Sequence, residues 1–276
     1  MSRRIRFTLC YDGTDYHGWQ LQPGLATIQG TLENVLGEIE GSPVHVLGSG
    51  RTDAGVHALA QVAACDLTNP IPCPNLRKAM NRLLPPDIRV LDVQEAPPDF
   101  HPRFHAKSKT YEYRIWRGEI CPPFERRYVY HFPYPINEQA FLDAAAVYVG
   151  EHDFSAFAAA DPKDSLGLSK VRRIFSSQAF RHGELLIFRV CGSGFLKHMV
   201  RNLVGGLIEI ARGNLTRQDL ADLLLPGRNS KLGFAAPARG LFLTSVEYNF
   251  SPATSACART VSWPIPQGSS SGEALP

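Results

Sequence analysis

One short stretch of the sequence carries the residue types that catalysis requires. Residues 48–57 read Gly-Ser-Gly-Arg-Thr-Asp-Ala-Gly-Val-His, with three glycines and a single acid, Asp53, two positions after Arg51. Glycine lets a backbone approach a ligand closely, and a neighbouring guanidinium stabilises a carboxylate as its anion. Such an isolated carboxylate can act as a nucleophile or as a base. The alternative is that Asp53 is a turn residue in a solvated loop.

The residues around this loop exclude several other uses of a glycine-rich segment. A phosphate-binding P-loop needs Lys followed by Ser or Thr after its last glycine, whereas Gly55 is followed by Val56 and His57. A calcium loop needs several acids at alternate positions, and Asp53 stands alone. The six cysteines are scattered without a C-x-x-C pair, which excludes zinc-ribbon and thioredoxin sites. We therefore expect neither a metal nor a cofactor.

Three other stretches combine aromatic, basic and amide side chains. They are residues 11–20, 108–114 and 194–206. In the first, Trp19 favours packing in the core over stacking on a base. In the second, Tyr111 lies on a predicted strand, where it can pack in the core or stack on a base. In the third, the spacing predicts a helix on which Lys197, His198 and Arg201 form a cationic face that can stabilise Asp53 or hold phosphates, or that is simply solvated.

The periodicity of apolar residues predicts the same order of elements twice. Alternation indicates strands, and spacings of three and four residues indicate helices. The first series, strand-helix-strand-strand-helix-strand, falls at residues 4–11, 25–41, 44–47, 62–67, 76–84 and 89–94. The second repeats this order with insertions, at residues 110–116, 137–149, 171–180, 185–191, 195–212 and 241–248.

This duplication predicts an α+β fold made of two ferredoxin-like βαββαβ half-domains, 1–107 and 108–250. Joining them edge to edge gives one mostly antiparallel sheet with helices on one face and an active-site cleft between the halves. The face without helices is expected to be free for a ligand, as in sheet-type RNA readers. Residues 251–276 are rich in Ser, Ala, Pro and Gly, and we expect a poorly ordered tail.

Composition places the chain in a broad class. The 29 basic and 26 acidic residues give a net charge of +3, which permits a nucleic-acid partner without demanding one. No apolar run is long enough for a membrane span, and single scattered cysteines suit a reducing compartment. We expect a soluble, cytoplasmic protein with no membrane partner.

Taken together, the motifs resemble those of the TruA-type tRNA pseudouridine synthases. The resemblance extends in family order from residue 4 to residue 250, and it is most specific around Asp53. It is carried by residues 11–13, 17–20, 50–58, 152–157 and 198–202. The ending Val56-His57-Ala58 is more similar to the bacterial branch than to the eukaryotic relatives.

The resemblance implies roles for four residues. Asp53 falls on the catalytic aspartate, Tyr111 on the tyrosine that stacks on the target uracil, and Arg201 on the arginine that pairs with the aspartate. Arg51 is implied to help flip and hold the nucleotide. The implied substrate is the anticodon stem-loop of tRNA at positions 38 to 40, and the implied assembly is a homodimer. Isomerising uridine oxidises nothing and adds no water, so no cofactor is implied.

Two other functions stay open. The chain can be a non-catalytic tRNA-binding or folding-assistant module that keeps the fold without turnover. It can also be a hydrolase that releases the base, although such enzymes normally use two carboxylates and the loop holds only Asp53.

Overall fold

The computed structural model describes residues 2–160, 167–226 and 232–249, and the predicted tail at 251–276 lies outside these residues. The first half of the chain contains six elements in the predicted order. They are β1 (Arg3–Tyr11), α1 (Ile28–Glu40), β2 (Leu47–Gly48), β3 (His57–Leu67), α2 (Cys73–Leu83) and β4 (Ile88–Glu95).

The second half repeats the order with insertions. Its main elements are β5 (Ala106–Trp116), α3 (Glu138–Ala144), β8 (Val171–His182), β9 (Leu185–Gly192), α4 (Met199–Ala211) and β10 (Leu241–Tyr248). The insertions add β6 (Tyr130–His131), β7 (Gly150–Asp153), α5 (Arg217–Asp222) and the short 3₁₀ helices Ala145–Tyr148, Ser155–Phe157 and Ala238–Gly240.

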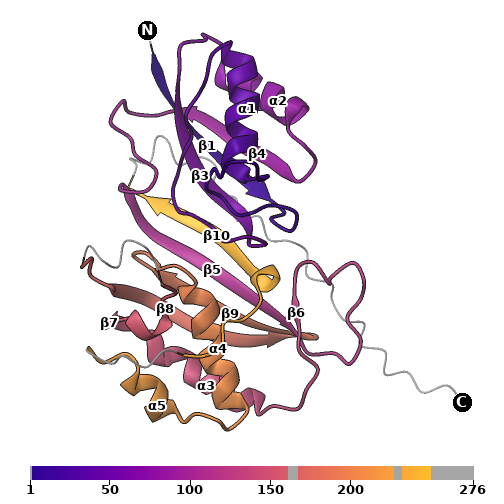
Figure 1. Cartoon of the computed structure of the whole chain (residues 1–276), viewed down its shortest axis with the longest axis vertical. Helices are drawn as coiled ribbons and strands as arrows, with labels where there is room; N and C mark the ends of the chain where they lie inside the picture. The colour runs from indigo at the N-terminus through magenta and orange to yellow at the C-terminus, as the bar shows by residue number, and fades with distance from the viewer. Residues whose placement is uncertain (1, 161–166, 227–231, 250–276) are drawn as a thin grey trace, which may run out of the picture.

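All described strands belong to one sheet, in which β4, β1, β3, β10, β5, β9, β8 and β7 are neighbours in that order. Within it, β4-β1-β3-β2 and β10-β5-β9-β8 each have the strand order of a ferredoxin-like unit, and only the β3–β10 and β5–β6 pairs are parallel. The predicted duplication and the mostly antiparallel sheet are confirmed. Figure 1 shows the two halves one above the other, with β10 and β5 running between them.

The halves meet through a short parallel pairing between β3 and β10. Phe242 pairs with His57 and Leu243 with Ala58, while β2 pairs further along the same edge of β3. The strand predicted at residues 44–47 is observed only as β2, which begins at the last predicted residue and pairs with Ala64 and Ala63 of β3.

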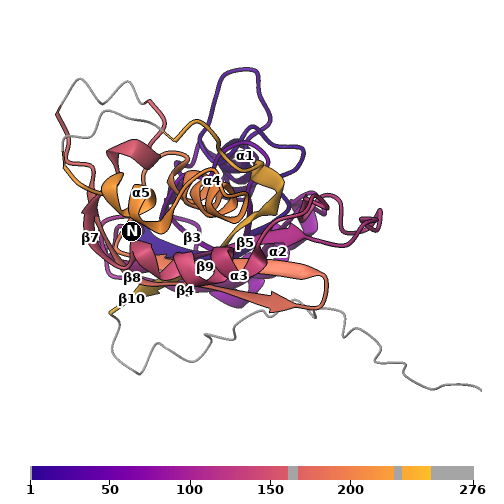
Figure 2. The ribbon, with the colours of Figure 1, turned by 90° about the horizontal axis from the view of Figure 1, so that it is seen from below.

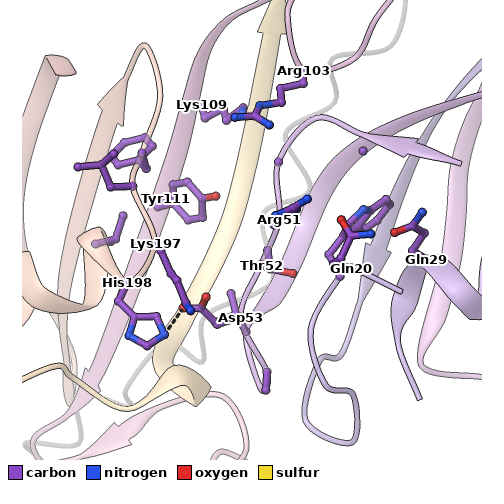
Figure 3. Close-up of a pocket in the computed structure, with 18 of the residues that line it drawn as sticks. Gln20, Gln29, Arg51, Thr52, Asp53, Arg103, Lys109, Tyr111, Lys197 and His198 are labelled. Atoms are coloured by element: carbon purple, nitrogen blue, oxygen red, sulfur yellow. Dashed lines mark ion pairs between the residues drawn. The ribbon is translucent and has the colours of Figure 1, made fainter. Parts of the chain in front are cut away.

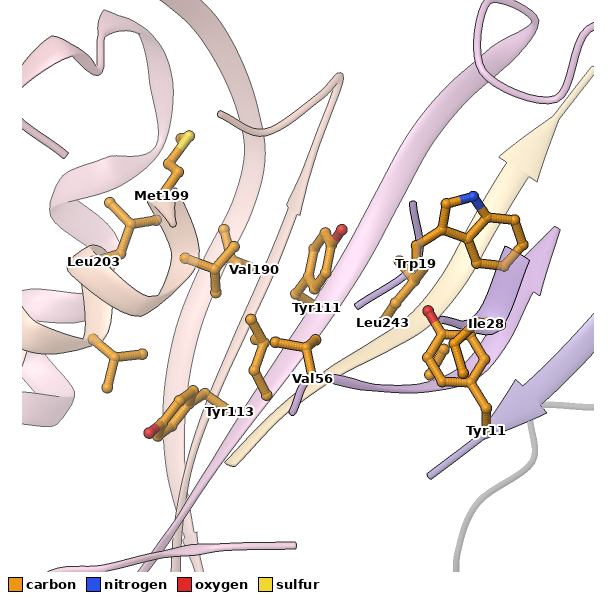
Figure 4. Packing of buried hydrophobic residues seen from close by; sticks show 14 of the residues in the cluster. Tyr11, Trp19, Ile28, Val56, Tyr111, Tyr113, Val190, Met199, Leu203 and Leu243 are labelled. Atoms are coloured by element: carbon orange, nitrogen blue, oxygen red, sulfur yellow. The ribbon is translucent and has the colours of Figure 1, made fainter. Parts of the chain in front are cut away.

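A continuous apolar core lies under both halves. In β1 the side chains alternate between buried and partly exposed, as predicted, and Ile5 and Leu9 are fully buried. The same core includes Trp19 and Ile28 of the first half and Leu203 of the second. Figure 4 shows these residues as one packed layer that crosses the junction. The halves therefore share a core, which fixes the geometry between them.

Local signals fix several helix boundaries. The Thr27 side chain accepts a hydrogen bond from the Gly30 amide and begins α1, and Gly41 ends it with φ 77°. At α5, Thr216 and Asp219 form a capping box. Caps of this kind contribute about 1 kcal/mol each.

The helix predicted at residues 195–212 begins later than expected. α4 starts at Met199, and His198, immediately before it, has a left-handed backbone with φ 60°. Lys197 and His198 are therefore not part of a helical face with Arg201, and that prediction was wrong. The apolar spacing of Phe195 and Met199 continues the helical pattern, so only the backbone shows where the helix begins.

No helix in the described ranges is long and apolar enough to cross a membrane.

Candidate active site

A cleft of about 940 Å³ lies between the two halves. Its walls include Gln29 of α1, Val200 near the start of α4, and the loop around Asp53. Figure 2 shows α1 and α4 on the same side of the sheet, so the cleft opens on the face that carries helices. The cleft therefore does not open on the bare face, which was expected to be free for a ligand. The gap between the helices of the two halves exposes the central strands on the covered face.

Asp53 lies in the cleft with two nitrogen-bearing side chains of the second half around it. Its Oδ2 is 3.4 Å from Arg201 Nη1 and 3.5 Å from His198 Nε2. The Asp53 side chain is 26% exposed, so the carboxylate is held by protein groups and still reachable from the cleft. Figure 3 shows Asp53 with Lys197 and His198 beside it and Tyr111 on the neighbouring strand.

Arg201 is fixed in position by its own neighbours. Its Nε donates a hydrogen bond of 2.7 Å to the Ala236 carbonyl, and its carbonyl accepts one from the Ala236 amide. The segment before β10 therefore aims the guanidinium at Asp53. Because Arg201 stays charged at all physiological pH values, it supplies Asp53 with a permanent cation.

His198 contributes differently. Burial lowers its pKa, and the nearby cations Arg201 and Lys197 act in the same direction, which together outweigh the opposing effect of Asp53. The imidazole is therefore neutral at pH 7. It can donate one hydrogen bond to the carboxylate but adds no charge.

Tyr111 lies on β5 with its ring in the wall of the cleft. It is 7% exposed and meets Phe195 edge to face, with ring centroids 5.0 Å apart. Burial raises the pKa of its hydroxyl well above the usual value, with Tyr11 and Asp53 adding to the shift, so the phenol stays neutral. Tyr111 was expected either to pack in the core or to stack on a base. Its ring packs against Phe195 and also lines the cleft, so one position is compatible with both.

The rest of the cleft is cationic. Arg51 is exposed, lines the cleft, and forms no ion pair with any residue that the structure describes. Asp53 is the only acid among the described residues of the cleft wall. Four cations share that wall with it: Arg51, Arg103, Lys109 and Lys197. This charge pattern suits a polyanionic ligand.

Lys109 is a site residue that the sequence did not single out. It is 9% exposed, and its Nζ donates a hydrogen bond of 2.6 Å to the Ser49 carbonyl. Burial lowers its pKa to about 8. Lys109 and Tyr111 are two residues apart on one strand, so the alternation that placed Tyr111 on the cleft face also places Lys109 there. This two-residue alternation along the strand was the sequence signal that could have identified Lys109 as a site residue.

The first aromatic stretch supports the Asp53 loop, and its residues His17, Trp19 and Gln20 also line the cleft. The Trp19 amide donates to the Thr52 carbonyl, and Tyr11 and Thr52 share a hydroxyl hydrogen bond of 2.8 Å. Gly18 has φ 86°, and a Cβ there would lie 2.5 Å from the Thr52 carbonyl oxygen. A Cβ on Gly13 would lie 2.0 Å from the Val56 carbonyl oxygen. The two loops fit together because these positions are glycines.

The fold and the site are those of a duplicated α+β sheet with one carboxylate in a cationic cleft. The sequence profile described as tRNA pseudouridine synthase matches residues 9–105 and 144–249. The chain is 62% identical to the tRNA pseudouridine synthase A of Solibacter usitatus, over 89% of this chain and all of that protein. It is 42% identical to the tRNA pseudouridine synthase A of Anoxybacillus flavithermus, over 90% of this chain and 99% of that protein. The chain belongs to the tRNA pseudouridine synthase family.

Among solved structures, similarity is found to the archaeal box H/ACA sRNP Nop10-Cbf5 complex. The identity is 12% and the TM-score 0.34, over 87% of this chain and 48% of that chain. At that level the family assignment depends on the sequence relatives alone.

Proposed function

We propose that this protein isomerises uridine to pseudouridine in tRNA, with Asp53 as the catalytic carboxylate. The observation that carries the proposal is a single reachable acid, paired with Arg201, on a cleft wall that otherwise carries cations. The reaction breaks the N1–C1′ bond of uridine, turns the uracil, joins C5 to C1′ and removes the C5 proton. Asp53 either attacks C1′ as a nucleophile or takes a proton from C2′ as a base.

The surrounding residues have distinct roles in this proposal. The target base must leave its stack to reach Asp53, and the Tyr111 ring replaces part of the lost stacking. Arg51 reaches the RNA from the rim of the cleft and holds the extruded nucleotide. Arg201 holds the carboxylate in position through its guanidinium group.

The substrate and assembly follow from the family resemblance. The proposed target is positions 38 to 40 of the anticodon stem-loop, and the proposed assembly is a homodimer acting in the cytoplasm. The division into half-domains 1–107 and 108–250 also stays a proposal. Light scattering of the purified protein tests the dimer, and mapping pseudouridines in bulk tRNA with and without the protein tests the positions.

The reaction itself is tested with a tRNA transcript carrying tritium at uracil C5. Isomerisation releases the tritium and leaves the base attached to the RNA. A binding module would release none, and a hydrolase would free uracil. Either of these two results would overturn the proposed reaction.

The role of the Tyr111 ring is tested by two substitutions. Tyr111→Phe keeps the ring against Phe195 and should retain most of the turnover, whereas Tyr111→Ala should lose about 10-fold or more, because stacking on a base contributes about 1–3 kcal/mol. Tritium release at saturating tRNA is the measurement. Equal losses in the two variants would assign the effect to the hydroxyl instead of the ring.

Lys109 gives a prediction about pH. With a pKa of about 8, its ammonium is about nine-tenths charged at pH 7 and about one-tenth charged at pH 9. The charged form is the one that attracts RNA, so the affinity of the wild type for tRNA should fall between these pH values. Lys109→Gln should show a smaller fall, whereas Lys107→Gln, an exposed lysine on the same strand, should behave like the wild type. Filter binding at fixed salt measures this; parallel pH profiles for the wild type and Lys109→Gln would contradict it.

A further inference from the structure

A second pocket, of about 510 Å³, lies on the other side of the Asp53 loop. It is lined by three arginines, Arg126, Arg127 and Arg239, together with Thr14, Gly55 and Ala238. We call it the arginine pocket. Arg126 and Arg127 come from the connection between β5 and β6, and Arg239 comes from the 3₁₀ helix Ala238–Gly240, before β10. Segments far apart in the sequence therefore bring three guanidinium groups to one place.

The described residues balance the charge of the arginine pocket only at Arg127. Arg127 Nη1 is paired with Asp15, at 3.1 Å, and lies 3.9 Å from Asp12. Arg126 donates to the Pro123 carbonyl, a neutral group. Within the described part of the chain, neither Arg126 nor Arg239 forms an ion pair, and both are exposed. Two guanidinium groups thus remain available to an anion.

The arginine pocket and the catalytic cleft share one loop as their wall. Ala54 and Val56 line the cleft, whereas Gly55 between them lines the arginine pocket. Gly55 has φ 74°, and a Cβ there would lie 3.4 Å from the Ala238 Cβ, so the loop passes close to the pocket wall. A ligand chain that reaches Asp53 from the cleft can continue over residues 54–56 into the arginine pocket.

The segment between β5 and β6 that carries Arg126 and Arg127, the arginine segment, is also anchored to the Asp53 loop. His57, at the end of the loop, lies with its Nε2 3.0 Å from the Arg127 carbonyl oxygen and its Nδ1 3.1 Å from the Gly13 amide nitrogen. Its ring stacks on Phe242 of β10, with centroids 4.8 Å apart. One buried histidine therefore holds the arginine segment, the catalytic loop and β10 in register. Such anchoring gives the arginine pocket a fixed place relative to Asp53.

We propose that the arginine pocket binds backbone phosphates of the tRNA strand next to the target uridine. The planar guanidinium fork matches the oxygens of a phosphate, and phosphate contacts set the position of a nucleic acid without reading its sequence. The arginine pocket would hold one stretch of the RNA strand while the cleft holds the extruded nucleotide. The RNA then crosses the Asp53 loop in a single alignment, with the target nucleotide at Asp53. This inference rests on the proposed function, because it takes tRNA as the ligand.

The test is the salt dependence of tRNA binding by the double variant Arg126→Gln/Arg239→Gln. Each arginine that no longer neutralises a phosphate should make the slope of log K against log[salt] shallower by about 0.7–0.9, so removing both should change it by about 1.5. Tritium release at saturating tRNA should stay within about threefold of the wild type, because neither residue touches Asp53. The matched control is Lys78→Gln/Arg82→Gln, which removes two exposed cations of α2 outside both pockets. It should keep the wild-type slope.

Three results would overturn the inference. The first is equal slopes for the arginine double variant and the α2 control. The second is loss of tritium release at saturating tRNA, which would make the arginines part of the chemistry. The third is an unchanged slope while millimolar inorganic phosphate raises the Tm of the wild type but not of the double variant, which would identify a site for a small anion.

Failure of the proposed function would look different. In that case the wild type itself would release no tritium, whereas the shallower slope of the double variant would still show a phosphate site. The slope and the tritium release therefore report on the two proposals separately.

Discussion

Asp53→Asn is expected to abolish pseudouridine formation while leaving tRNA binding within a few-fold of the wild type. The amide has nearly the same shape as the carboxylate but can neither attack C1′ nor accept the C2′ proton. Removing a catalytic group of this kind costs roughly 10²–10⁴-fold in rate. Binding survives because the cations of the cleft, Arg51, Arg103, Lys109 and Lys197, are untouched.

The measurement is tritium release from C5-labelled tRNA, paired with a binding isotherm for each protein. Asp99→Asn is the control, because Asp99 is an exposed acid that does not line the cleft. It should behave like the wild type in both assays. Substantial pseudouridine formation by Asp53→Asn would remove Asp53 from the catalytic role, and a large loss of tRNA binding would show that the carboxylate is a binding group.

Arg201→Gln is expected to give the second largest loss. The substitution removes the permanent cation 3.4 Å from the Asp53 carboxylate and the hydrogen bond that fixes its direction at Ala236. Removing one preorganised electrostatic partner from an active site typically lowers kcat by roughly 10²–10³-fold. His198 cannot compensate, because its lowered pKa keeps the imidazole neutral at pH 7.

Two further variants show whether Arg201→Gln acts by removing the positive charge or by disturbing the fold. Arg201→Lys keeps the charge without the planar fork, so it should recover part of the lost kcat. Arg212→Gln, at the exposed end of the same helix, should keep full activity. Single-turnover rates at saturating tRNA make the comparison. If Arg201→Gln lowers the Tm and tRNA affinity in parallel with kcat, Arg201 is a structural residue of the junction and not a partner of Asp53.

The order of helices and strands could be predicted from the sequence, because the patterns that define each element lie within a few neighbouring residues. Alternation in residues 4–11 acts over a few residues and the structure confirms it, and the cap at Thr27 that begins α1 is equally local. The duplicated order then determined the strand neighbours, since a βαββαβ unit has few ways to bury both helices on one sheet. The strands that join the two halves could not be predicted in the same way. The parallel pairing of β3 with β10 joins segments almost 200 residues apart in the chain, and no local pattern of either strand indicates it.

The site was partly readable for a similar reason. Asp53 and Arg51 stand in one loop with a distinctive spacing, and the structure places both on the wall of one cleft. The contact between Asp53 and Arg201, which the family resemblance implied, is present. The face on which the cleft opens was not predicted, because the sequence indicates that helices cover one face but not that a cleft lies between α1 and α4 on that face.

Lys109 was missed as a residue of the site, whereas His198 was expected near Asp53 but on a helix. Lys109 is a buried lysine, and sequence alone gives such a residue no signature beyond its period-two relation to Tyr111. His198 reaches Asp53 from a left-handed backbone just before α4, a conformation that a non-glycine residue adopts only when its surroundings impose it. Both positions depend on tertiary contacts and not on local pattern.

The central position of β10 also determines when the sheet that joins the two halves can be completed during synthesis. β10 follows all other described strands along the chain, yet it lies between β3 and β5 and completes the junction of the halves. A nascent chain can fold its first half early, because domains form as they emerge from the ribosome. The sheet that joins the two halves is complete only after β10 has been synthesised. A fragment that ends between residues 212 and 240 contains both Asp53 and Arg201 but lacks the strand that connects their halves.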